Sequence, residues 1–407
     1  MLVVCVRRGV ESIIGAAARP PRAPAAGGGR FALLVDSEQL QVAHLDADAF
    51  YVSVELGRRP ELAGKPVVVA HSGARAVVTT ASYEARVYGV GSAMPAARAR
   101  RLCPQAIFIE PDFSTYREVS RRMMEIVRAH VERVEVVGLD EAYLDLGGLL
   151  APRAAMRRLI AEISATMGLT CSVGIGPNKL VAKVASDAEK PAGFVVLDRE
   201  GACARFASSP PGLIPGIGPK TAARLAELGL HTLAAVASAP EELLAKSFGR
   251  NHGRDLGRRA RFESDAPVGA ERKVVSESRE RTFERDISDL AALEAELVAM
   301  ARALCASLGA RERAGRTIGI KVRLDDFTTV TRARTLPRAT CAHETVSDVA
   351  LTLLREYNPA QPVRLLGVRV AGLQPLQADG EDVREARDGA EDSRGATQGQ
   401  LRLPACT

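Results

Sequence analysis

Hydrophobic residues in the first half of the chain recur at spacings that alternate between strand and helix. Tyr116, Val119, Met123 and Val127 fall on one face of a helix, which predicts an amphipathic helix over residues 114–130. Short apolar runs before and after it predict strands. The full prediction is strand 41–46, helix 51–58, strands 66–70 and 76–80, helix 114–130, strands 131–137 and 142–146, helix 152–167, strand 170–175 and helix 178–188.

The order of these elements predicts a ferredoxin-like sheet with an insertion. If residues 59–113 are set aside, the remaining strands and helices run β-α-β-β-α-β, an arrangement whose sheet can display carboxylates on one face. The pattern recurs near the end of the chain. There it predicts strand 274–283, helix 290–308, strands 317–324 and 328–336, helix 345–356 and strand 363–373.

A glycine-rich string links the two patterns. Residues 214–220 read Ile-Pro-Gly-Ile-Gly-Pro-Lys and precede a predicted helix over 221–228. Free backbone N–H groups at a helix start bind anions, and the string resembles a helix-hairpin-helix element, which grips a nucleic-acid backbone. A tight turn is the alternative reading of the same glycines. A weaker second copy is predicted around residues 247–250.

The chain ends and one internal segment lack such patterns. Residues 1–38 are rich in Ala, Pro, Gly and Arg, and residues 376–407 are acidic and rich in Gly and Ala, which predicts disorder in both. Residues 268–273 are predicted to be a linker. A chain of 407 residues with 46% apolar content is too long for one core and should form several domains.

Composition narrows the class of protein. The seven cysteines form no CxxC pair, which indicates reduced thiols in a cytosolic protein, and no apolar run reaches the roughly 18 residues of a membrane span. The formal net charge is +6, and the excess is concentrated in two segments, 246–261 and 316–338. Two basic surfaces suit an extended phosphate backbone, although solvated faces would give the same pattern.

Two acidic clusters stand out because each lies in an apolar, strand-like run without Lys or Arg. One contains Asp46 and Asp48, and the other contains Asp140 and Glu141. Buried carboxylates without partners are costly, so such groups neutralise or coordinate a metal. Magnesium prefers carboxylate and phosphate oxygens, which points to phosphoryl or nucleotidyl transfer. Each acid taken alone could instead be a turn or cap residue.

Taken together, residues 41–375 resemble the Y-family of translesion DNA polymerases, most closely its DNA polymerase IV branch. The resemblance implies an α+β, multidomain right-hand polymerase. Its ferredoxin-like palm would span residues 39–58 and 114–205, small fingers 59–113, a helical helix-hairpin-helix thumb 206–267, and a βαββαβ little-finger domain 274–375. The implied activity is template-directed, error-prone addition of deoxynucleotides to a primer 3′ end past damaged bases, without a proofreading exonuclease.

The resemblance also assigns the catalytic centre. Asp46, Asp140 and Glu141 would be the catalytic carboxylates and, with the Ala47 backbone carbonyl, would hold two Mg²⁺ ions. Asp48 would support them. Asp140 and Glu141 are adjacent, so the backbone must bend for both to reach a metal, as the tip of a hairpin allows.

Nucleotide and DNA contacts follow from other motifs of the same family. Tyr83 and Arg86 in Ala-Ser-Tyr-Glu-Ala-Arg, together with Lys190, would bind the triphosphate; a helix-surface pair is the alternative for the first two. Lys179 and Lys183 are expected to be ordinary surface charges. Tyr51 would be a steric gate against ribonucleotides, beside Phe50 at the pocket or in the core. DNA contacts are expected from Gly216, Gly218, Lys220, Arg323, Arg332 and Arg334.

Two positions depart from the family pattern, since Gly138 stands for a usual Ser and Gly91 for a frequent Arg. Residues 400–403 (Gln-Leu-Arg-Leu) partly resemble a sliding-clamp peptide. The expected partners are primer-template DNA, deoxynucleoside triphosphates and the clamp, with a monomer in the bacterial cytoplasm, at the nucleoid, and no membrane. The competing hypotheses are a non-catalytic DNA-binding scaffold, which would not need the carboxylates, and a nucleotide cyclase, which would not need the helix-hairpin-helix.

Overall fold

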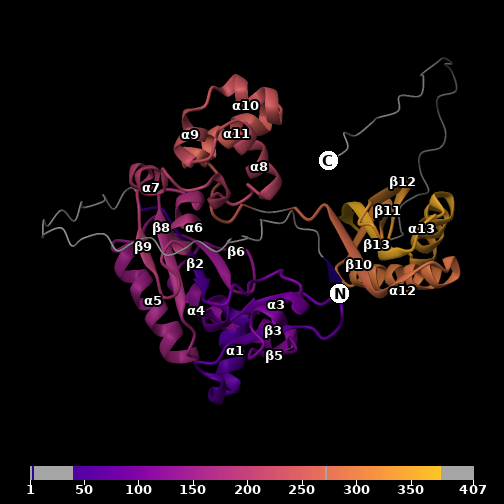
Figure 1. Cartoon of the computed structure of the whole chain (residues 1–407), viewed down its shortest axis with the longest axis horizontal. Helices are drawn as coiled ribbons and strands as arrows, with labels where there is room; N and C mark the ends of the chain where they lie inside the picture. Colours follow the sequence, from indigo (N-terminus) through magenta and orange to yellow (C-terminus); the bar gives the residue numbers. More distant parts are fainter. Residues whose placement is uncertain (1, 4–39, 271–272, 377–407) are drawn as a thin grey trace, which may run out of the picture. The chain divides into compact units, whose positions relative to one another are not determined.

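The computed structural model of the chain describes residues 2–3, 40–270 and 273–376 (Figure 1). The chain folds into two compact units. The larger contains the described residues of Cys5–Val274 with Thr282–Ile287, and the smaller contains those of Met1–Val4, Val275–Arg281 and Ser288–Thr407. The predicted tail and clamp peptide lie outside the described residues. No helix in the described part is both long enough and apolar enough to cross a membrane.

The sheet of the larger unit is built around a central strand, β2 (Val42–Ala47), that is buried along its whole length. Strand β2 pairs antiparallel with β7 (Glu141–Asp145) and β8 (Cys171–Gly176). The outer strands β6 (Val134–Val136) and β9 (Phe194–Val196) give the order β6-β7-β2-β8-β9. Without β9 this is the strand order of a ferredoxin-like sheet, so the predicted palm fold is confirmed.

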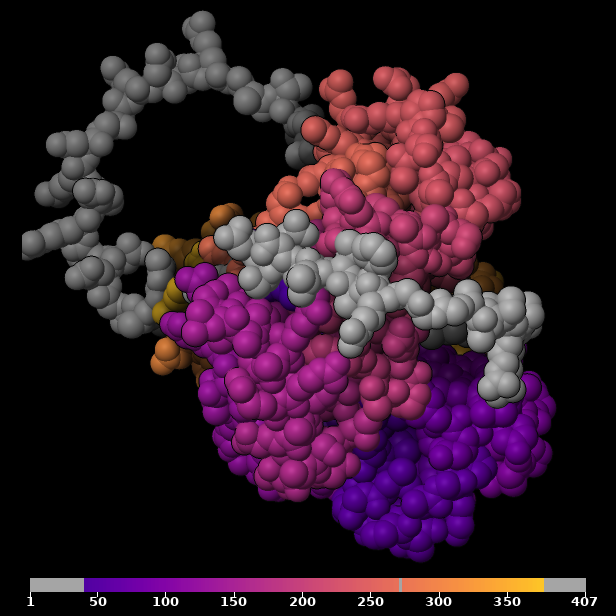
Figure 2. Space-filling model, turned by 90° about the vertical axis from the view of Figure 1, so that its left-hand side faces the viewer, coloured from indigo at the N-terminus to yellow at the C-terminus, as the bar shows by residue number. Residues whose placement is uncertain are grey.

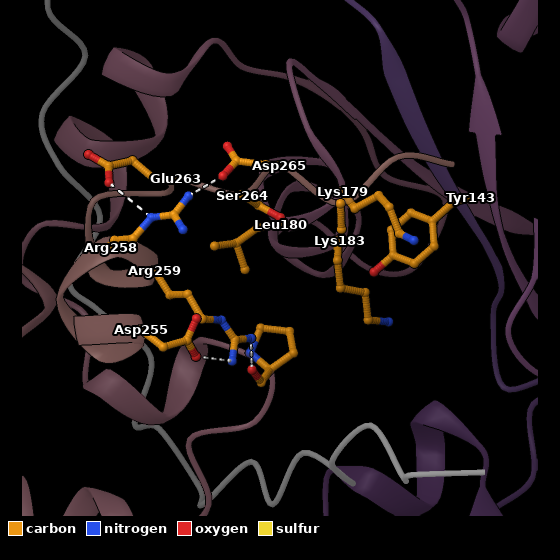
Figure 3. A pocket seen from close by; sticks show the side chains of 12 residues that line it. Tyr143, Lys179, Leu180, Lys183, Asp255, Arg258, Arg259, Glu263, Ser264 and Asp265 are labelled. Carbon is orange, nitrogen blue, oxygen red and sulfur yellow. Dashed lines mark hydrogen bonds and ion pairs between the residues drawn. The ribbon is translucent and has the colours of Figure 1, made fainter. Parts of the chain in front are cut away.

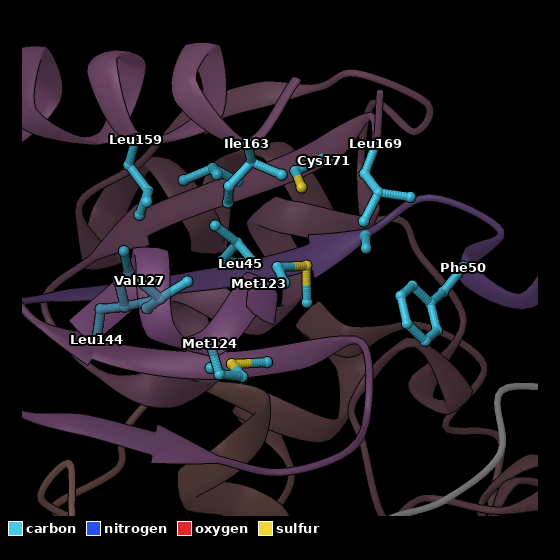
Figure 4. Close-up of a cluster of buried hydrophobic side chains, with 14 of the residues drawn as sticks. Leu45, Phe50, Met123, Met124, Val127, Leu144, Leu159, Ile163, Leu169 and Cys171 are labelled. Carbon is cyan, nitrogen blue, oxygen red and sulfur yellow. The ribbon is translucent and has the colours of Figure 1, made fainter. Parts of the chain in front are cut away.

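Helices cover the two faces of this sheet differently. Helices α1 (Phe50–Arg58), α4 (Phe113–His130) and α5 (Pro152–Met167) contribute to the main core, in which Figure 4 shows side chains of α4 and α5 around Leu45. Helix α6 (Lys179–Asp187) packs on β2 and β8 from the opposite side. Because successive residues of a strand point to opposite faces, Leu45 enters the core, while its neighbours on β2 face α6.

The insertion forms a small three-stranded sheet of its own with the strand order β4-β3-β5. Its apolar core contains Val68, Val78, Ala85 and Ala99. The two predicted strands are confirmed within two residues. The elements are η2 (Pro60–Leu62), β3 (Val67–Ala70), β4 (Val78–Ala81), α2 (Tyr83–Arg86), α3 (Ala96–Leu102) and β5 (Ile107–Ile109).

A helical segment follows the palm and forms the salmon-coloured lobe at the top of Figure 2. Its core contains Ile214, Leu225, Leu244 and Leu256 and continues onto Val184 of α6, so this lobe is packed against the palm. The elements are α7 (Arg199–Phe206), η3 (Pro211–Leu213), α8 (Pro219–Glu227), α9 (Leu233–Ser238), α10 (Glu241–Phe248) and α11 (Arg250–Ala260).

The smaller unit has the predicted element order βαββαβ but a different strand order from the palm. Its elements are β10 (Ser276–Ile287), α12 (Leu290–Gly309), β11 (Arg313–Leu324), β12 (Thr329–Thr340), α13 (His343–Tyr357) and β13 (Val363–Pro375). The sheet runs β1-β10-β13-β11-β12, with the last strand inside. Strand β1 (Leu2–Val3) pairs with β10, so the prediction of disorder over residues 1–38 is wrong for these two residues; residues 4–38 are not described.

Helix α6 lies unusually close to the sheet because β8 carries Gly174 beneath it. A Cβ added at Gly174 would lie 2.1 Å from the Ala182 carbonyl oxygen and 2.2 Å from the Ser186 backbone nitrogen. Only glycine allows this approach of two backbones. The helix begins after Asn178, whose side chain accepts a hydrogen bond from Val181 N, and so its polar face is held over β2.

We predict that Gly174→Ala lowers the free energy of unfolding by about 1–3 kcal/mol or more, because the added methyl meets backbone that cannot move away. The matched control is Gly57→Ala on the exposed side of α1, where an added Cβ meets nothing within 4 Å. That change should stabilise the helix by roughly 0.5–1 kcal/mol. Urea denaturation would measure both, and equal stability of the two variants would contradict the close approach.

Candidate active site

The first acidic cluster lies at the end of β2 and faces the start of β7. Asp46 is directly opposite Glu141 in the antiparallel register. The chain turns sharply just before β7, where the backbone N–H groups of Val137 and Gly138 both donate to the Glu141 carbonyl at 3.0 and 3.3 Å. Asp140 lies in this turn, and its carbonyl accepts from Ala47 N at 2.9 Å. The predicted bend at the hairpin tip is therefore present.

Negative charge is crowded at this point. One ligand atom each from His44, Asp46 and Glu141 lies within 4.8 Å of the other two. Asp140 does not belong to that set. Burial and then the charges of Asp46 and Glu141 raise the pKa of Asp140 to about 7. Gly138 leaves room for it, because a Cβ there would lie 3.1 Å from Asp140 Oδ1.

Two lysines of the segment after β8 balance part of this charge. Lys190 Nζ lies 2.7 Å from Asp46 Oδ2, and Lys183 Nζ lies 3.0 Å from Glu141 Oε2 and 3.4 Å from Asp46 Oδ2. Burial disfavours the charged form of Lys183, but the Asp187, Asp46 and Glu141 carboxylates outweigh it and raise its pKa. Although burial opposes it, the charge of the Lys183 ammonium helps to hold the pKa of Glu141 at about 2.

The expectation that Lys179 and Lys183 are ordinary surface charges is wrong. Lys183 is part of the carboxylate cluster described above. Lys179 is buried and forms an ion pair with Glu135 at 2.5 Å, while Nζ also donates to the Pro267 carbonyl at 3.2 Å. Gly269 N donates to the same Glu135 oxygen at 3.1 Å, so this pair ties residues 267–269 to the palm.

His44 is a site residue that sequence reasoning missed. It lies two residues before Asp46, which places both side chains on the same face of β2. The imidazole is fully buried, its Nδ1 is 2.8 Å from Ser186 Oγ, and its Nε2 is 3.2 Å from Glu141 Oε2. Burial lowers the pKa of His44, which favours the neutral ring.

Asp48 organises the second layer around the cluster. Its carboxylate accepts hydrogen bonds from Ser172 Oγ at 2.8 Å, Ala192 N at 2.9 Å and the Tyr83 hydroxyl at 3.4 Å. Asp48 is 3% exposed and therefore points away from solvent. These bonds join the loop that carries Lys190 to the palm, which fits the supporting role expected for Asp48.

Tyr83 and Arg86 lie on the short helix α2, whose N-terminus is capped by Ser82. The guanidinium of Arg86 stacks 4.5 Å from the Tyr83 ring centre, and its Nε donates to the Ala81 carbonyl at 3.0 Å. Arg86 is otherwise exposed, whereas burial, and then the charge of Asp48, raise the pKa of Tyr83. Tyr83 thus reaches the layer around the carboxylates, and Arg86 flanks it.

Tyr51 and Phe50 start helix α1 and have different environments. Tyr51 is partly exposed and packs against the rings of Phe113 and Tyr116, at centroid distances of 5.8 and 4.7 Å. Burial and then the nearby Asp140 raise its pKa to about 12. Phe50 is 2% exposed and belongs to the core, which is the second of the two positions expected for it.

The glycine-rich string forms a hairpin that leads into α8. Gly216 has φ +94°, a left-handed conformation that favours glycine, and Gly218 is the residue before the helix. Lys220 in the first turn is exposed, and the first N–H groups of the helix have no intrahelical acceptor. Arg259 of α11 donates to the Pro215 carbonyl and so secures the hairpin from behind.

The arginines predicted on the second sheet do not share one face. The register pairs Arg332 and Arg334 with Ile320 and Ile318, whose side chains are buried beneath the helices. Arg332 and Arg334 accordingly lie on the face of the sheet that the helices cover, where Arg334 pairs with Glu356 at 2.8 Å. Arg323 lies on the opposite, open face. The expectation that all three arginines contact DNA from one surface of this sheet is therefore wrong.

A pocket of about 470 Å³ opens between α6 and α11, next to Lys183 (Figure 3). Its arginines are already paired, Arg258 with Asp265 and Arg259 with Asp255. The lining residues are Tyr143, Lys179, Leu180, Lys183, Pro215, Asp255, Arg258, Arg259, Glu263, Ser264, Asp265 and Ala266.

The donor set fits a divalent cation. Burial and the neighbouring carboxylates raise the pKa of Asp140 even with two ammonium groups in the cluster. A buried imidazole nitrogen that faces the cluster has no hydrogen-bond partner in the described part of the chain. Both observations mark a demand for positive charge. A ferredoxin-like palm that presents clustered carboxylates beside lysines, with a helix-hairpin-helix lobe, defines a polymerase-type nucleotidyltransferase.

Comparison with known proteins identifies the family. Residues 45–187 match the impB/mucB/samB family, and residues 274–383 match the C-terminal domain of that family. DNA polymerase IV of Xanthomonas axonopodis pv. citri (strain 306) is 40% identical over 368 residues, which cover 89% of this chain and 97% of that protein. DNA polymerase IV of Methanoculleus marisnigri (strain ATCC 35101 / DSM 1498 / JR1) is 41% identical over 340 residues, covering 82% and 94%.

Solved structures agree with the sequence relatives. The Y-family DNA polymerase chimera Dbh-Dpo4(243-245)-Dbh is 27% identical, with a TM-score of 0.72, and covers 81% of this chain and 98% of its own. An insertion ternary complex of Dbh DNA polymerase is similar with a TM-score of 0.59, 27% identity and the same coverage. The chain belongs to the Y-family of translesion DNA polymerases, in its DNA polymerase IV branch, and depends on a divalent metal.

We predict that Asp48→Ala lowers the free energy of unfolding by about 1–3 kcal/mol, because it leaves buried donors without an acceptor. Ser172→Ala removes one of those donors instead of the shared acceptor and should cost less. Thermal and urea unfolding of both variants against the parent would test this. Asp48→Ala with parental stability would contradict the organising role.

Proposed function

We propose that Asp46, Asp140 and Glu141, with the Ala47 backbone carbonyl, hold two Mg²⁺ ions. The supporting observation is the convergence of these acids from β2 and the β6–β7 turn beside two lysines. Bound ions of this kind activate a primer 3′-hydroxyl and neutralise charge on the phosphates. The non-catalytic scaffold is not favoured, since it has no use for such costly buried acids.

The chain's own cations then bind the triphosphate of the incoming deoxynucleotide. Among the described residues, Lys190 and Lys183 are balanced only by the carboxylates of the cluster and Asp187, so their ammonium groups lie where phosphate oxygens would be received. Arg86 is exposed and free to turn outward from its stacking on Tyr83. Tyr83 donates to Asp48 and can present the same hydroxyl to a phosphate.

DNA contacts are assigned to two surfaces. The hairpin at Gly216 and Gly218, with Lys220, offers backbone N–H groups and one charge to a phosphate backbone. On the second sheet the open face at Arg323 takes that role, while Arg332 and Arg334 could reach a backbone only past the sheet edge. We further propose that the protein acts as a monomer on primer-template DNA in the bacterial cytoplasm, with residues 400–403 contacting a sliding clamp.

Replacing Asp140 and Glu141 together with alanine should slow primer extension with Mg²⁺ at least about a thousandfold, since several kcal/mol of transition-state stabilisation would be lost. Asp145→Ala on the same strand is the matched control and should extend primers normally, because its carboxylate faces Arg133 and Gly147. Fluorescence anisotropy should show retained DNA binding. Equal extension by the double variant and the parent would refute the metal assignment.

Tyr51→Ala should raise the incorporation of ribonucleotides relative to deoxynucleotides by about tenfold or more, because removal of the ring makes room for a 2′-hydroxyl. Tyr51→Phe keeps the packing against Phe113 and Tyr116 and should retain sugar selectivity. Single-nucleotide insertion with each sugar would measure the ratio. An unchanged ratio in the alanine variant would remove Tyr51 from the gate.

A further inference from the structure

The imidazole of His44 is fixed in one tautomer by its neighbours. The Ser186 hydroxyl lies 2.8 Å from the Lys183 carbonyl oxygen, which can only accept, and the serine has a single proton to donate. With that proton donated to the Lys183 carbonyl, Ser186 Oγ accepts from His44 Nδ1–H at 2.8 Å. In the neutral ring, Nε2 is then a bare nitrogen with a lone pair directed toward the carboxylate cluster.

Nε2 has no hydrogen-bond partner among the described residues, although it is completely buried and only 3.2 Å from Glu141 Oε2. Two ligands of one octahedral ion are arranged in this way, because donors about 2.1 Å from an ion lie about 3 Å apart and each points at the ion. The same arrangement without a cation places two lone pairs against each other.

Other contacts hold the ring in this orientation. Tyr143, which is opposite His44 in the register, packs edge-on against the imidazole at a centroid distance of 4.7 Å. The bond from Nδ1 to Ser186 continues to the backbone of α6. Metal-binding histidines characteristically have their second ring nitrogen fixed by such a partner.

We propose that His44 Nε2 is a nitrogen ligand of a divalent cation held with Asp46 and Glu141. This rests on the proposed metal site and adds a ligand to it. Imidazole favours first-row transition metals, whereas Mg²⁺ prefers oxygen alone. The nitrogen therefore makes this position less selective for Mg²⁺ over transition-metal ions, and Mn²⁺, which accepts both oxygen and nitrogen ligands, can serve as its probe. The Lys183 ammonium, which contacts the same two carboxylates, moves aside when the ion binds.

Pulsed electron paramagnetic resonance of the full chain with Mn²⁺ alone tests the ligand directly. We expect nitrogen coupling to the bound Mn²⁺, and we expect it to change to the ¹⁵N pattern when only the histidines are ¹⁵N-labelled. The labelling requires no substitution, so a folding defect cannot obscure the result. Bound Mn²⁺ without coupling, or coupling insensitive to histidine labelling, would overturn the inference.

Variants assign the coupling to one histidine. His44→Phe should abolish it and weaken Mn²⁺ binding roughly tenfold, the low end of what loss of a partner to a metal ligand costs. His71→Phe is the matched control, because His71 is exposed and pairs with Glu110, and it should change neither. A coupling that survives His44→Phe would overturn the inference. If the parent and the Asp140→Ala, Glu141→Ala variant bind Mn²⁺ equally, the proposed metal site fails as well.

Discussion

The repulsion among carboxylates at the junction of β2 and β7 is the constraint on which the rest of the larger unit depends. Asp46 and Glu141 are paired across the sheet, and Asp140 follows from the adjoining turn, so no rotation of one side chain can separate the charges. Burial strengthens the repulsion, as the raised pKa of Asp140 shows. The fold must therefore bring cations or a metal to this one place, and the neighbouring elements are arranged to do so.

Helix α6 meets that requirement only because it lies almost in contact with the sheet. Gly174 removes the side chain that would separate them, and Lys183 and Ser186 then reach β2 from above. The same helix packs its apolar side, including Val184, against the helical lobe. One helix thus supplies a counter-charge to the site, fixes the His44 ring and joins two lobes, which explains why a single glycine matters for all three.

Local patterns in the sequence predicted the helices and strands and their order along the chain. They also predicted the acidic residues of the site. Both predictions succeeded because hydrophobic periodicity and buried charge are local properties of the sequence. Local patterns failed for Lys183, whose partner Asp46 is 137 residues away, since helical spacing says only which residues share a face. Arg332 and Arg334 were misplaced for a related reason. Their face depends on the pairing register with β11, and a one-residue slip in that register reverses every side chain. His44 carried a usable signal, being two residues from Asp46 on a buried strand.

The two sheets show how one element order can serve opposite charges. In the palm, the first strand is central and carries acids that α6 covers, so those acids need partners inside the protein. In the smaller unit, β13 and β11 are interior, and the open face carries Arg323 and Arg369 in contact with water. Water already solvates such guanidinium groups, and they can exchange it for phosphate at little cost. Covered carboxylates, in contrast, are stable only beside a fixed cation, which suits a site that must hold metal and substrate in one geometry.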